Sequence, residues 1–530
     1  MKKLLLPALL TCCFFSASAQ SSLRVHIANG MLEGEQDSGN VRIFRGIPFA
    51  QPPVGDLRWK EPQPVKNWKG VRKALRFAPR PMQTAHFKDM LFRSGKYSED
   101  CLYLNVWAPN TTPNTTSNTT PDTTTDEKFP VLVYFYGGGL YAGDASEVRY
   151  DGASMARKGI VVVTVNYRLG IFGFFAHPRL TDESPHHSSG NYGYLDQLAA
   201  LRWVQTNIGA FGGDPARVTI AGQSAGSMSV SVQMASPLSK GLFAGAIGES
   251  GSILGVPGPP GLNIGEQMGA RFTGSLNTSF DALREEPAQQ LMEEAAKSGF
   301  HFSTIVDGYF LPRSPREIFT AGRQASVPLL AGWNATEVSW NNIIENDEPT
   351  VPNYFSALLK IYGSSAEAAA RNYPAANKDE VLRSATDLAT DRFMGYSTWK
   401  WIDLQARTGG KPVYRYLFAQ QQPPWADAKE PAQTPPFPIA PHSAEIAYAL
   451  GNLAVYNIYA WTSDDYKTSG IMQGFFAGFI RTGDPNGEGL PAWSAYRPET
   501  PNVMIIDKDA RQEQAKNSNR FLFLDSFYYK

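Results

Sequence analysis

The sequence contains little cysteine and carries no excess of charge of either sign. Three of its 530 residues are cysteine, and two of them, Cys12 and Cys13, lie near the N-terminus. If that segment is removed, Cys101 is left alone and no intrachain disulfide can form. Lys plus Arg and Asp plus Glu both number 49, so the chain lacks the basic surface with which proteins bind nucleic acid or anionic lipid. These absences favour a neutral globular protein without a disulfide framework or a nucleic-acid partner.

Long hydrophobic runs are also absent, except at the N-terminus. There, Lys2 and Lys3 are followed by an apolar segment and by small residues up to Ala19, which is the order of a secretory signal peptide and its cleavage site. We expect residues 1–19 to be cleaved and residues 20–530 to be exported, to the periplasm or out of the cell, without a membrane span. A signal anchor and a lipoprotein signal are the alternatives.

Histidine is scarce as well. The seven histidines do not cluster with one another or with cysteine at the spacing of a metal site. The sequence therefore predicts neither a metal nor an organic cofactor.

Short, β-branched apolar runs alternate with helical segments in the rest of the chain. The runs are mostly apolar rather than alternating, as expected for strands buried on both faces. This order predicts an α/β fold with a large, mostly parallel central sheet and helices on both faces. The expected strands are 131–136, 160–166, 218–222, 327–332 and 413–418, and the clearest helices are 194–208 and 225–235.

We expect residues 20–530 to form a single catalytic domain with three surface features. Residues 110–126 are almost wholly Asn, Thr, Pro and Ser, a composition that predicts a flexible loop, and their Asn-Thr-Thr triplets also match glycosylation acceptors. Residues 255–325 and 345–410 read as helical insertions, which we expect to form a cap or the wall of a gorge.

The most informative motif is Gly222-Gln223-Ser224-Ala225-Gly226, which follows an apolar strand and precedes a helix. A serine on such a sharp strand-to-helix turn is the nucleophile elbow of α/β-hydrolases. Neighbours without a Cβ allow the strand and the helix to approach each other closely. We predict Ser224 to be a nucleophile.

An acyl-transfer serine needs hydrogen-bond donors for the oxyanion. The glycine-rich sequence Tyr136-Gly137-Gly138-Gly139 follows an expected strand, where such a loop belongs. We predict the backbone N–H groups of Gly138, Gly139 and Ala225 to be the donors.

The serine also needs a base and an acid. His442 lies well after the serine, where the chain order Ser, acid, His of this fold places the base. Glu337 lies between them, just after an expected strand, but its position alone does not distinguish a catalytic acid from a solvated loop residue.

With these motifs the chain resembles the type-B carboxylesterases. Within that family, its pattern of motifs is most similar to the bacterial para-nitrobenzyl esterases. The resemblance covers nearly all of the sequence after the signal. It is carried by Phe44-Arg45-Gly46-Ile47-Pro48-Phe49-Ala50, Ser98-Glu99-Asp100-Cys101-Leu102-Tyr103-Leu104-Asn105-Val106, Asn166-Tyr167-Arg168-Leu169-Gly170, Gly190-Asn191-Tyr192-Gly193, Phe211-Gly212-Gly213-Asp214-Pro215 and Arg481-Thr482-Gly483-Asp484-Pro485.

The resemblance implies an α/β-hydrolase fold and a secreted serine carboxylesterase. Its Ser-His-Glu triad would be Ser224, His442 and Glu337, acting through an acyl-enzyme. It further implies that Ser250 hydrogen-bonds the triad glutamate and that Gln223 supports the site. Arg45 and Glu99 match a structural ion pair of the family.

The chain departs from the family in three places. Met82 stands where a disulfide cysteine is common, and Val338 where glycine is common after the triad glutamate. Leu91 replaces the tryptophan with which cholinesterases hold quaternary ammonium, and the neutral Gln223 replaces their glutamate. A choline ester is therefore a poor candidate substrate.

The expected partner is a small-molecule ester with an apolar or aromatic part, whereas the oligomeric state is left open. The candidate pocket residues are Tyr136, Leu140, Phe174, Trp333 and Leu91. Two alternatives remain: an amide, carbamate or polyester hydrolase that uses the same site, and a non-catalytic binding or adhesion module built on a cholinesterase-like scaffold.

Overall fold

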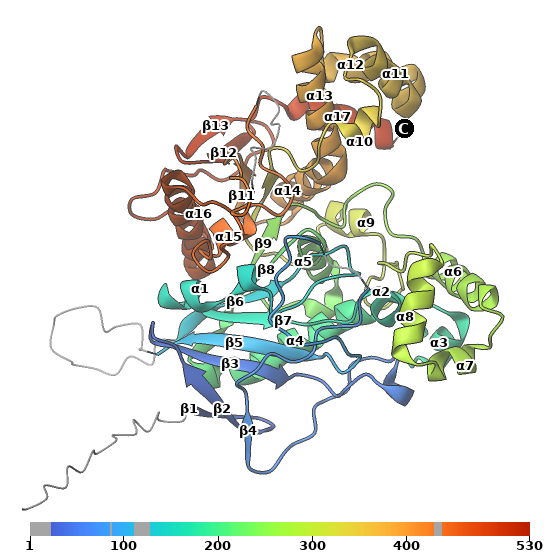
Figure 1. Cartoon of the computed structure of the whole chain (residues 1–530), viewed down its shortest axis with the longest axis vertical. Coiled ribbons are helices and arrows are strands. Elements are labelled where there is room, and N and C mark those ends of the chain that lie inside the picture. The colour runs from blue at the N-terminus through green and yellow to red at the C-terminus, as the bar shows by residue number, and fades with distance from the viewer. Residues whose placement is uncertain (1–22, 85–86, 111–127, 429–436, 530) are drawn as a thin grey trace, which may run out of the picture.

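The computed structural model describes residues 23–84, 87–110, 128–428 and 437–529 (Figure 1). The expected signal peptide and all but Asn110 of the expected Asn/Thr-rich loop lie outside these residues. The described chain is organised around one 13-stranded sheet with the order β1-β2-β3-β5-β7-β6-β8-β9-β10-β11-β12-β13, and β4 pairs with β2.

The centre of this sheet is parallel, as the sequence predicts. Every residue of β6 and β7 is buried, and because successive side chains of a strand point to opposite faces, both faces of the sheet are covered here. The parallel strands are β7 (Val161–Val165), β6 (Phe129–Phe135), β8 (Gly213–Gln223), β9 (Gly245–Glu249), β10 (Leu329–Asn334), β11 (Val413–Phe418) and β12 (Asn502–Ile506).

Both ends of the sheet are antiparallel, which makes the whole sheet mixed. The first strands of the chain form one end and a C-terminal hairpin forms the other. These strands are β1 (Leu23–Ile27), β2 (Gly30–Gln36), β3 (Val41–Pro48), β5 (Tyr103–Pro109) and β13 (Arg511–Gln514), with the short β4 (Val71–Lys73) beside β2.

The helices that follow the central strands pack directly on the sheet. Helix α4 and helix α5 contact β8, α14 contacts β10 and β11, and α16 contacts β6, β8 and β12. Their bounds are α4 (Tyr192–Asn207), α5 (Ala225–Ala235), α14 (Tyr396–Thr408) and α16 (Ser463–Thr482), and shorter helices are α1 (Ala153–Arg157), α2 (Gly170–Phe174), α3 (Pro178–Glu183) and α15 (Ile446–Ala449).

The two expected insertions form two separate helical groups in Figure 1. The first contains α6 (Leu262–Ser275), α7 (Phe280–Glu285) and α8 (Ala288–Lys297), near α3, and is followed by α9 (Pro315–Thr320). The second contains α10 (Asn341–Ile344), α11 (Val351–Tyr362), α12 (Ala366–Asn372), α13 (Lys378–Thr390) and the C-terminal α17 (Ser518–Tyr528). A π-helical turn, Asp391–Gly395, joins α13 to α14.

Candidate active site

Ser224 lies at the turn between β8 and α5 in a conformation that L-residues seldom adopt. Its φ is +57° and its ψ is −122°, which is strained for a residue with a Cβ. Close packing explains the glycine at 226, since a Cβ there would come within 2.0 Å of the carbonyl oxygen of Phe135. The backbone N–H of Ser224 donates to the carbonyl of Glu249 (2.8 Å) and ties the turn to β9.

The glycine-rich loop after β6 runs beside this serine. A Cβ on Gly137 would lie 3.1 Å from Cβ of Ser224. Gly138 and Gly139 have φ values of +109° and +64°, which glycine adopts without steric cost. Ala225 begins α5, and the first N–H groups of a helix have no partner within that helix. The predicted oxyanion donors therefore lie on segments that adjoin Ser224.

The structure brings Glu337 and His442 into direct contact. Nδ1 of His442 lies 2.6 Å from Oε2 of Glu337, and the two residues are also joined through the backbone, where the N–H of His442 donates to the carbonyl of Glu337 (3.1 Å). The other carboxylate oxygen accepts a bond from the backbone N–H of Asn334 (2.8 Å), the last residue of β10. The carboxylate is thus held on both oxygens and fixes the orientation of the imidazole.

The opposite side of the imidazole faces the serine turn. Nε2 of His442 lies 3.4 Å from the side-chain amide of Gln223, the residue before Ser224. Burial lowers the pKa of His442, but the charge of Glu337 and its hydrogen bond outweigh burial, so the pKa is raised above its ordinary value. Because the protonated form of the imidazole is stabilised, His442 can accept a proton from a group at the serine turn.

Two contacts implied by the family resemblance are different in the structure. The Ser250 hydroxyl donates to Oε1 of Glu445 (3.1 Å) instead of Glu337, whose oxygens already accept bonds from Asn334 and His442. Glu445 lies three residues after His442, and no motif in the sequence marks it as part of the site.

The expected ion pair between Arg45 and Glu99 is wrong. Glu99 pairs with Arg58, whose Nη2 and Nε bond its two carboxylate oxygens at 2.6 and 2.7 Å. Arg45 pairs with Glu35 instead, because it lies on β3 and Glu35 lies on the neighbouring strand β2.

Three of the candidate pocket residues are packed in the core, where they offer almost no surface to a ligand. Tyr136 stacks on Tyr167, Phe174 meets Tyr194 edge to face, and Trp333 contacts Phe521 and Arg415. Each of the three is 1% exposed. Leu140 is also buried, whereas Leu91 is partly exposed.

An aromatic residue that is not among the predicted site residues, Phe393, lies against the histidine. The ring of Phe393 is 5.2 Å from the imidazole of His442 and 45% exposed. It belongs to the π-helical turn between α13 and α14, a type of distortion that is frequent at functional sites. No periodicity in the sequence marks such a turn.

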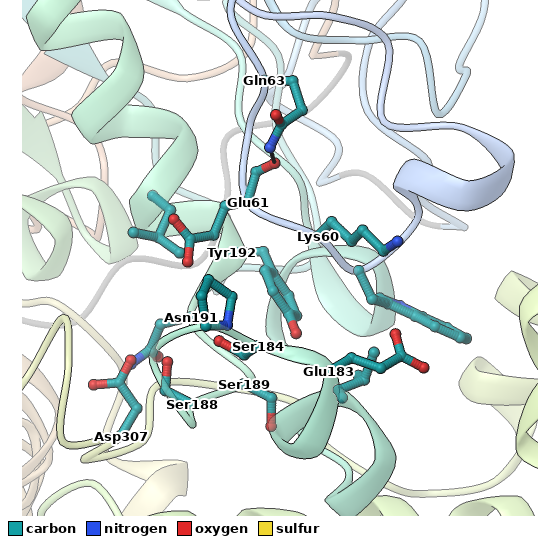
Figure 2. Close-up of a pocket in the computed structure, with 14 residues that line it drawn as sticks. Lys60, Glu61, Gln63, Glu183, Ser184, Ser188, Ser189, Asn191, Tyr192 and Asp307 are labelled. Carbon is teal, nitrogen blue, oxygen red and sulfur yellow. Dashed lines mark hydrogen bonds between the residues drawn. The ribbon is translucent and has the colours of Figure 1, made fainter.

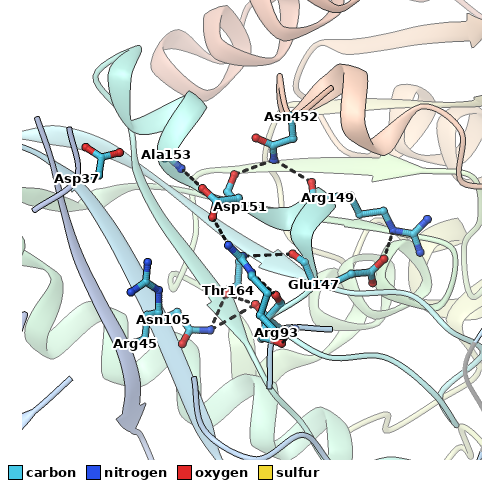
Figure 3. Close-up of polar contacts among 12 residues, drawn as sticks. Asp37, Arg45, Arg93, Asn105, Glu147, Arg149, Asp151, Ala153, Thr164 and Asn452 are labelled. Carbon is cyan, nitrogen blue, oxygen red and sulfur yellow. Dashed lines mark hydrogen bonds and ion pairs between the residues drawn. The ribbon is translucent and has the colours of Figure 1, made fainter. Parts of the chain in front are cut away.

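A network of ion pairs around the buried Arg149 supports the loop that carries His442. Arg149 pairs with Asp89 (2.7 Å) and with Glu147 (2.5 Å), and it also donates to the hydroxyl of Ser443, the residue after His442. Ser443 in turn donates to Asp89 (3.0 Å). Figure 3 shows the pair of Arg149 and Glu147, with Asn452 bonded to the carbonyl of Arg149.

A cavity of about 190 Å³ lies elsewhere, beside the segment between α3 and α4 (Figure 2). It is smaller than the ~300–1,000 Å³ pockets that enclose drug-sized ligands. Its lining contains none of Ser224, Glu337 and His442. The lining residues are Trp59, Lys60, Glu61, Gln63, Leu180, Glu183, Ser184, Pro185, Ser188, Ser189, Asn191, Tyr192, Leu195 and Asp307.

Among the described residues, no group of three or more His, Cys, Asp or Glu side chains is placed to hold a metal ion. The helices in this part of the chain are all too short or too polar to cross a membrane.

The mixed sheet with a parallel centre, and a serine at a strained turn from a strand into a helix, define an α/β-hydrolase fold. Solved structures with this architecture include a PNB esterase (TM-score 0.78, 30% identity, covering 94% of this chain and 99% of the esterase). A carboxylesterase of Geobacillus stearothermophilus is similarly related (TM-score 0.76, 31% identity, 94% and 99% covered).

Sequence comparison gives the family. The pattern of the Carboxylesterase family matches residues 21–524. Liver carboxylesterase 1 of Oryctolagus cuniculus is 35% identical over 507 residues, which cover 86% of this chain and 84% of the relative. The fumonisin B1 esterase of Sphingopyxis macrogoltabida is 35% identical over 494 residues, with 89% and 84% covered. The chain belongs to the carboxylesterase family and is a carboxylic ester hydrolase.

Proposed function

We propose that this protein is a serine carboxylesterase whose triad is Ser224, His442 and Glu337. The observation that carries the proposal is the short bond from His442 Nδ1 to Glu337 (2.6 Å), with the other side of the imidazole turned toward the strained serine turn. The raised pKa of His442 suits a base that must become an imidazolium during the reaction.

The reaction proceeds in two halves. His442 takes the proton of the Ser224 hydroxyl as its oxygen attacks the ester carbonyl, and the N–H groups of Gly138, Gly139 and Ala225 hold the oxyanion. The alcohol leaves with the proton returned by His442, and an acyl-enzyme remains. A water molecule deprotonated by His442 then attacks the acyl carbon, and the acid leaves as Ser224 recovers its proton.

We propose small esters with an apolar or aromatic part as substrates. The exposed ring of Phe393 beside His442 supports this class, because an apolar group bound there would remove the ring from water next to the reacting bond. The neutral Gln223 places no charge on this side of the imidazole, which disfavours a cationic choline ester.

We also propose that the protein is exported after cleavage before Gln20. The support is the order of basic, apolar and small residues in 1–19, which is that of a signal peptide. The mass of the protein recovered outside the cytoplasm should correspond to residues 20–530, and the mass of the full chain would contradict the proposal.

The catalytic proposal is tested with Ser224→Ala. We expect the variant to fold, to lose para-nitrophenyl ester hydrolysis by at least about 10⁵-fold, and to resist a fluorophosphonate that labels the unaltered protein. Ser231→Ala, which changes another buried serine of α5, serves as the matched control and should keep both properties. Labelling of Ser224→Ala at the original rate would contradict the proposal.

The alternative activities are separated by their substrates. Matched ester and anilide substrates distinguish an esterase from an amidase. Release of soluble products from a polyester film tests for a polyester hydrolase. An unaltered protein that hydrolyses nothing and takes no label would be the binding module instead.

A further inference from the structure

Three glutamates are buried together behind the proposed catalytic histidine. Glu249 ends β9, and Glu337 and Glu445 lie on the loops after β10 and around His442. Glu249 and Glu445 are each 0% exposed and Glu337 is 2% exposed. So many carboxyl groups in one dry region cannot all be charged without strong repulsion, and the triad chemistry uses only Glu337.

Hydrogen bonds distinguish the other two glutamates. Oε1 of Glu445 accepts from the Ser250 hydroxyl (3.1 Å), and Oε2 accepts from the side-chain amide of Asn334 (2.6 Å). Oε1 of Glu249 accepts from the Tyr134 hydroxyl (3.0 Å), but its Oε2 is buried with no partner among the described residues.

This difference determines which carboxyl group carries the charge. A buried anionic oxygen without a hydrogen bond is far more costly than a buried neutral acid. Glu249 fits the neutral form, and Glu445, with donors on both oxygens, fits the charged form.

Glu445 is also connected to the proposed triad from two sides. The amide of Asn334 that donates to Glu445 also donates to the carbonyl of Pro441 (2.7 Å), the residue before His442. The backbone N–H of the same Asn334 holds the carboxylate of Glu337. A charge on Glu445 therefore orders Asn334, and through it both partners of the triad.

We propose that Glu249 and Glu445 form a carboxyl pair that holds one proton while the enzyme works, with Glu249 neutral and Glu445 charged. In this state Glu445 is a positioning residue for Glu337 and His442, and its charge favours the imidazolium. The proposal rests on the proposed catalytic function, because it concerns the basicity of His442.

Burial raises the pKa of both glutamates, so the pair keeps a proton above the pH at which an ordinary carboxyl group loses it. Burial raises the pKa of Glu249 well above its ordinary value, and the charge of Glu445 raises it further. Burial and the charge of Glu337 raise the pKa of Glu445 to about 7. The other groups that face this region are the cation Arg149, which lowers the pKa of His442, and the tyrosines at 134, 150 and 416, whose burial keeps them neutral.

The test compares the isosteric variants Glu445→Gln and Glu249→Gln in the mature enzyme. The acid limb of the pH profile of kcat/KM reports the pKa of the free enzyme's base. Loss of the Glu445 charge should move this limb to lower pH by roughly 0.5–1 unit. Glu249→Gln replaces a neutral acid with a neutral amide and should move it by less than about 0.3 unit.

Thermal unfolding supplies a readout that needs no activity. A carboxyl group whose pKa is raised in the folded state keeps a proton that the unfolded chain releases, so the folded state loses stability as the pH rises. For Glu445 this loss begins near the ordinary pKa of 4.5 and is complete above about 7. The fall in Tm from pH 5 to pH 9 should therefore be smaller in both variants than in the unaltered protein.

The outcomes separate this proposal from the catalytic one. Equal shifts of the acid limb in both variants would overturn it, since Glu249 would then be charged, and so would an unchanged limb in Glu445→Gln. If Glu445→Gln does not fold, a shift larger than about 0.3 unit in Glu249→Gln, or an unaltered fall of its Tm with pH, overturns the pair on its own. Full turnover in Ser224→Ala would instead contradict the catalytic proposal and leave the Tm comparison valid.

Discussion

At the level of single residues, the position of Ser224 depends on the glycines on either side of it, Gly222 and Gly226, which have no side chains. A Cβ at Gly222 would lie 2.5 Å from the carbonyl oxygen of Phe135, and a Cβ at Gly226 would lie 2.0 Å from the same atom. The strand and the helix therefore meet at backbone-to-backbone distance, and Ser224 lies at the turn between them. This packing stabilises the strained backbone conformation of Ser224.

Gly226→Ala tests that explanation. The new methyl group must displace β6 or α5, so we expect a loss of about 2–4 kcal/mol in the free energy of unfolding, measured by urea denaturation, and a large fall in kcat. Gly274→Ala is the control, since nothing lies within 4 Å of a Cβ at this position of α6, and it should change stability by at most about 1 kcal/mol in the favourable direction. Equal stability of the two variants would refute the packing argument.

At the level of elements, the loop that carries His442 is held by a buried cation. Arg149 lies on the short segment after the glycine-rich loop, and it joins Glu147, Asp89 and Ser443. Through Asp89 it also connects to the segment before β5, which no local sequence pattern links to the histidine. The segments that carry Arg149 and Asp89 therefore hold the loop of His442 in place, although both are far from it in the sequence.

Arg149→Met should be strongly destabilising, because it leaves Glu147 and Asp89 without their cation. We expect a loss of about 3–5 kcal/mol in urea denaturation, together with a lower kcat. Arg157→Met removes an exposed arginine that pairs with Asp37 and should cost less than about 1 kcal/mol. The double variant Glu147→Gln and Arg149→Met should recover part of the loss, and no recovery would argue against an uncompensated charge as the cause.

At the level of the whole molecule, the described residues form a large hydrophobic core, and the one cysteine among them is not in a disulfide. Cys101 is free and 1% exposed, and the sheet places it directly before β5 in the core. Burial raises the pKa of its thiol well above the ordinary value, which suppresses the reactive thiolate.

A protein of residues 20–530, the product of the proposed signal cleavage, should therefore react with a thiol reagent slowly when folded. We expect one thiol per chain to react in guanidinium, and the native rate to be lower by at least about 100-fold. A reductant should leave Tm unchanged, since a single cysteine cannot form an intrachain disulfide. Rapid labelling of the native protein would show that the region around β5 opens readily.

The sequence by itself determined the local features of this protein. Runs such as 413–418 correspond to a strand with the same bounds, and the helix 225–235 is reproduced residue for residue, because hydrophobic periodicity and glycine spacing act within a few residues. The strained turn at Ser224 was likewise visible as a motif. Family resemblance, rather than spacing, selected Glu337 from the acidic loop residues.

Tertiary structure alone decided which distant side chains meet. It paired Arg58 with Glu99 and brought Glu445 within hydrogen-bond distance of Ser250. It also packed three aromatic candidates for the pocket into the core, namely Tyr136, Phe174 and Trp333. Such contacts depend on the order of strands in the sheet and on the competition of several donors for each buried oxygen. Neither is encoded in the residues next to a buried group, so these contacts form only when the whole sheet is assembled.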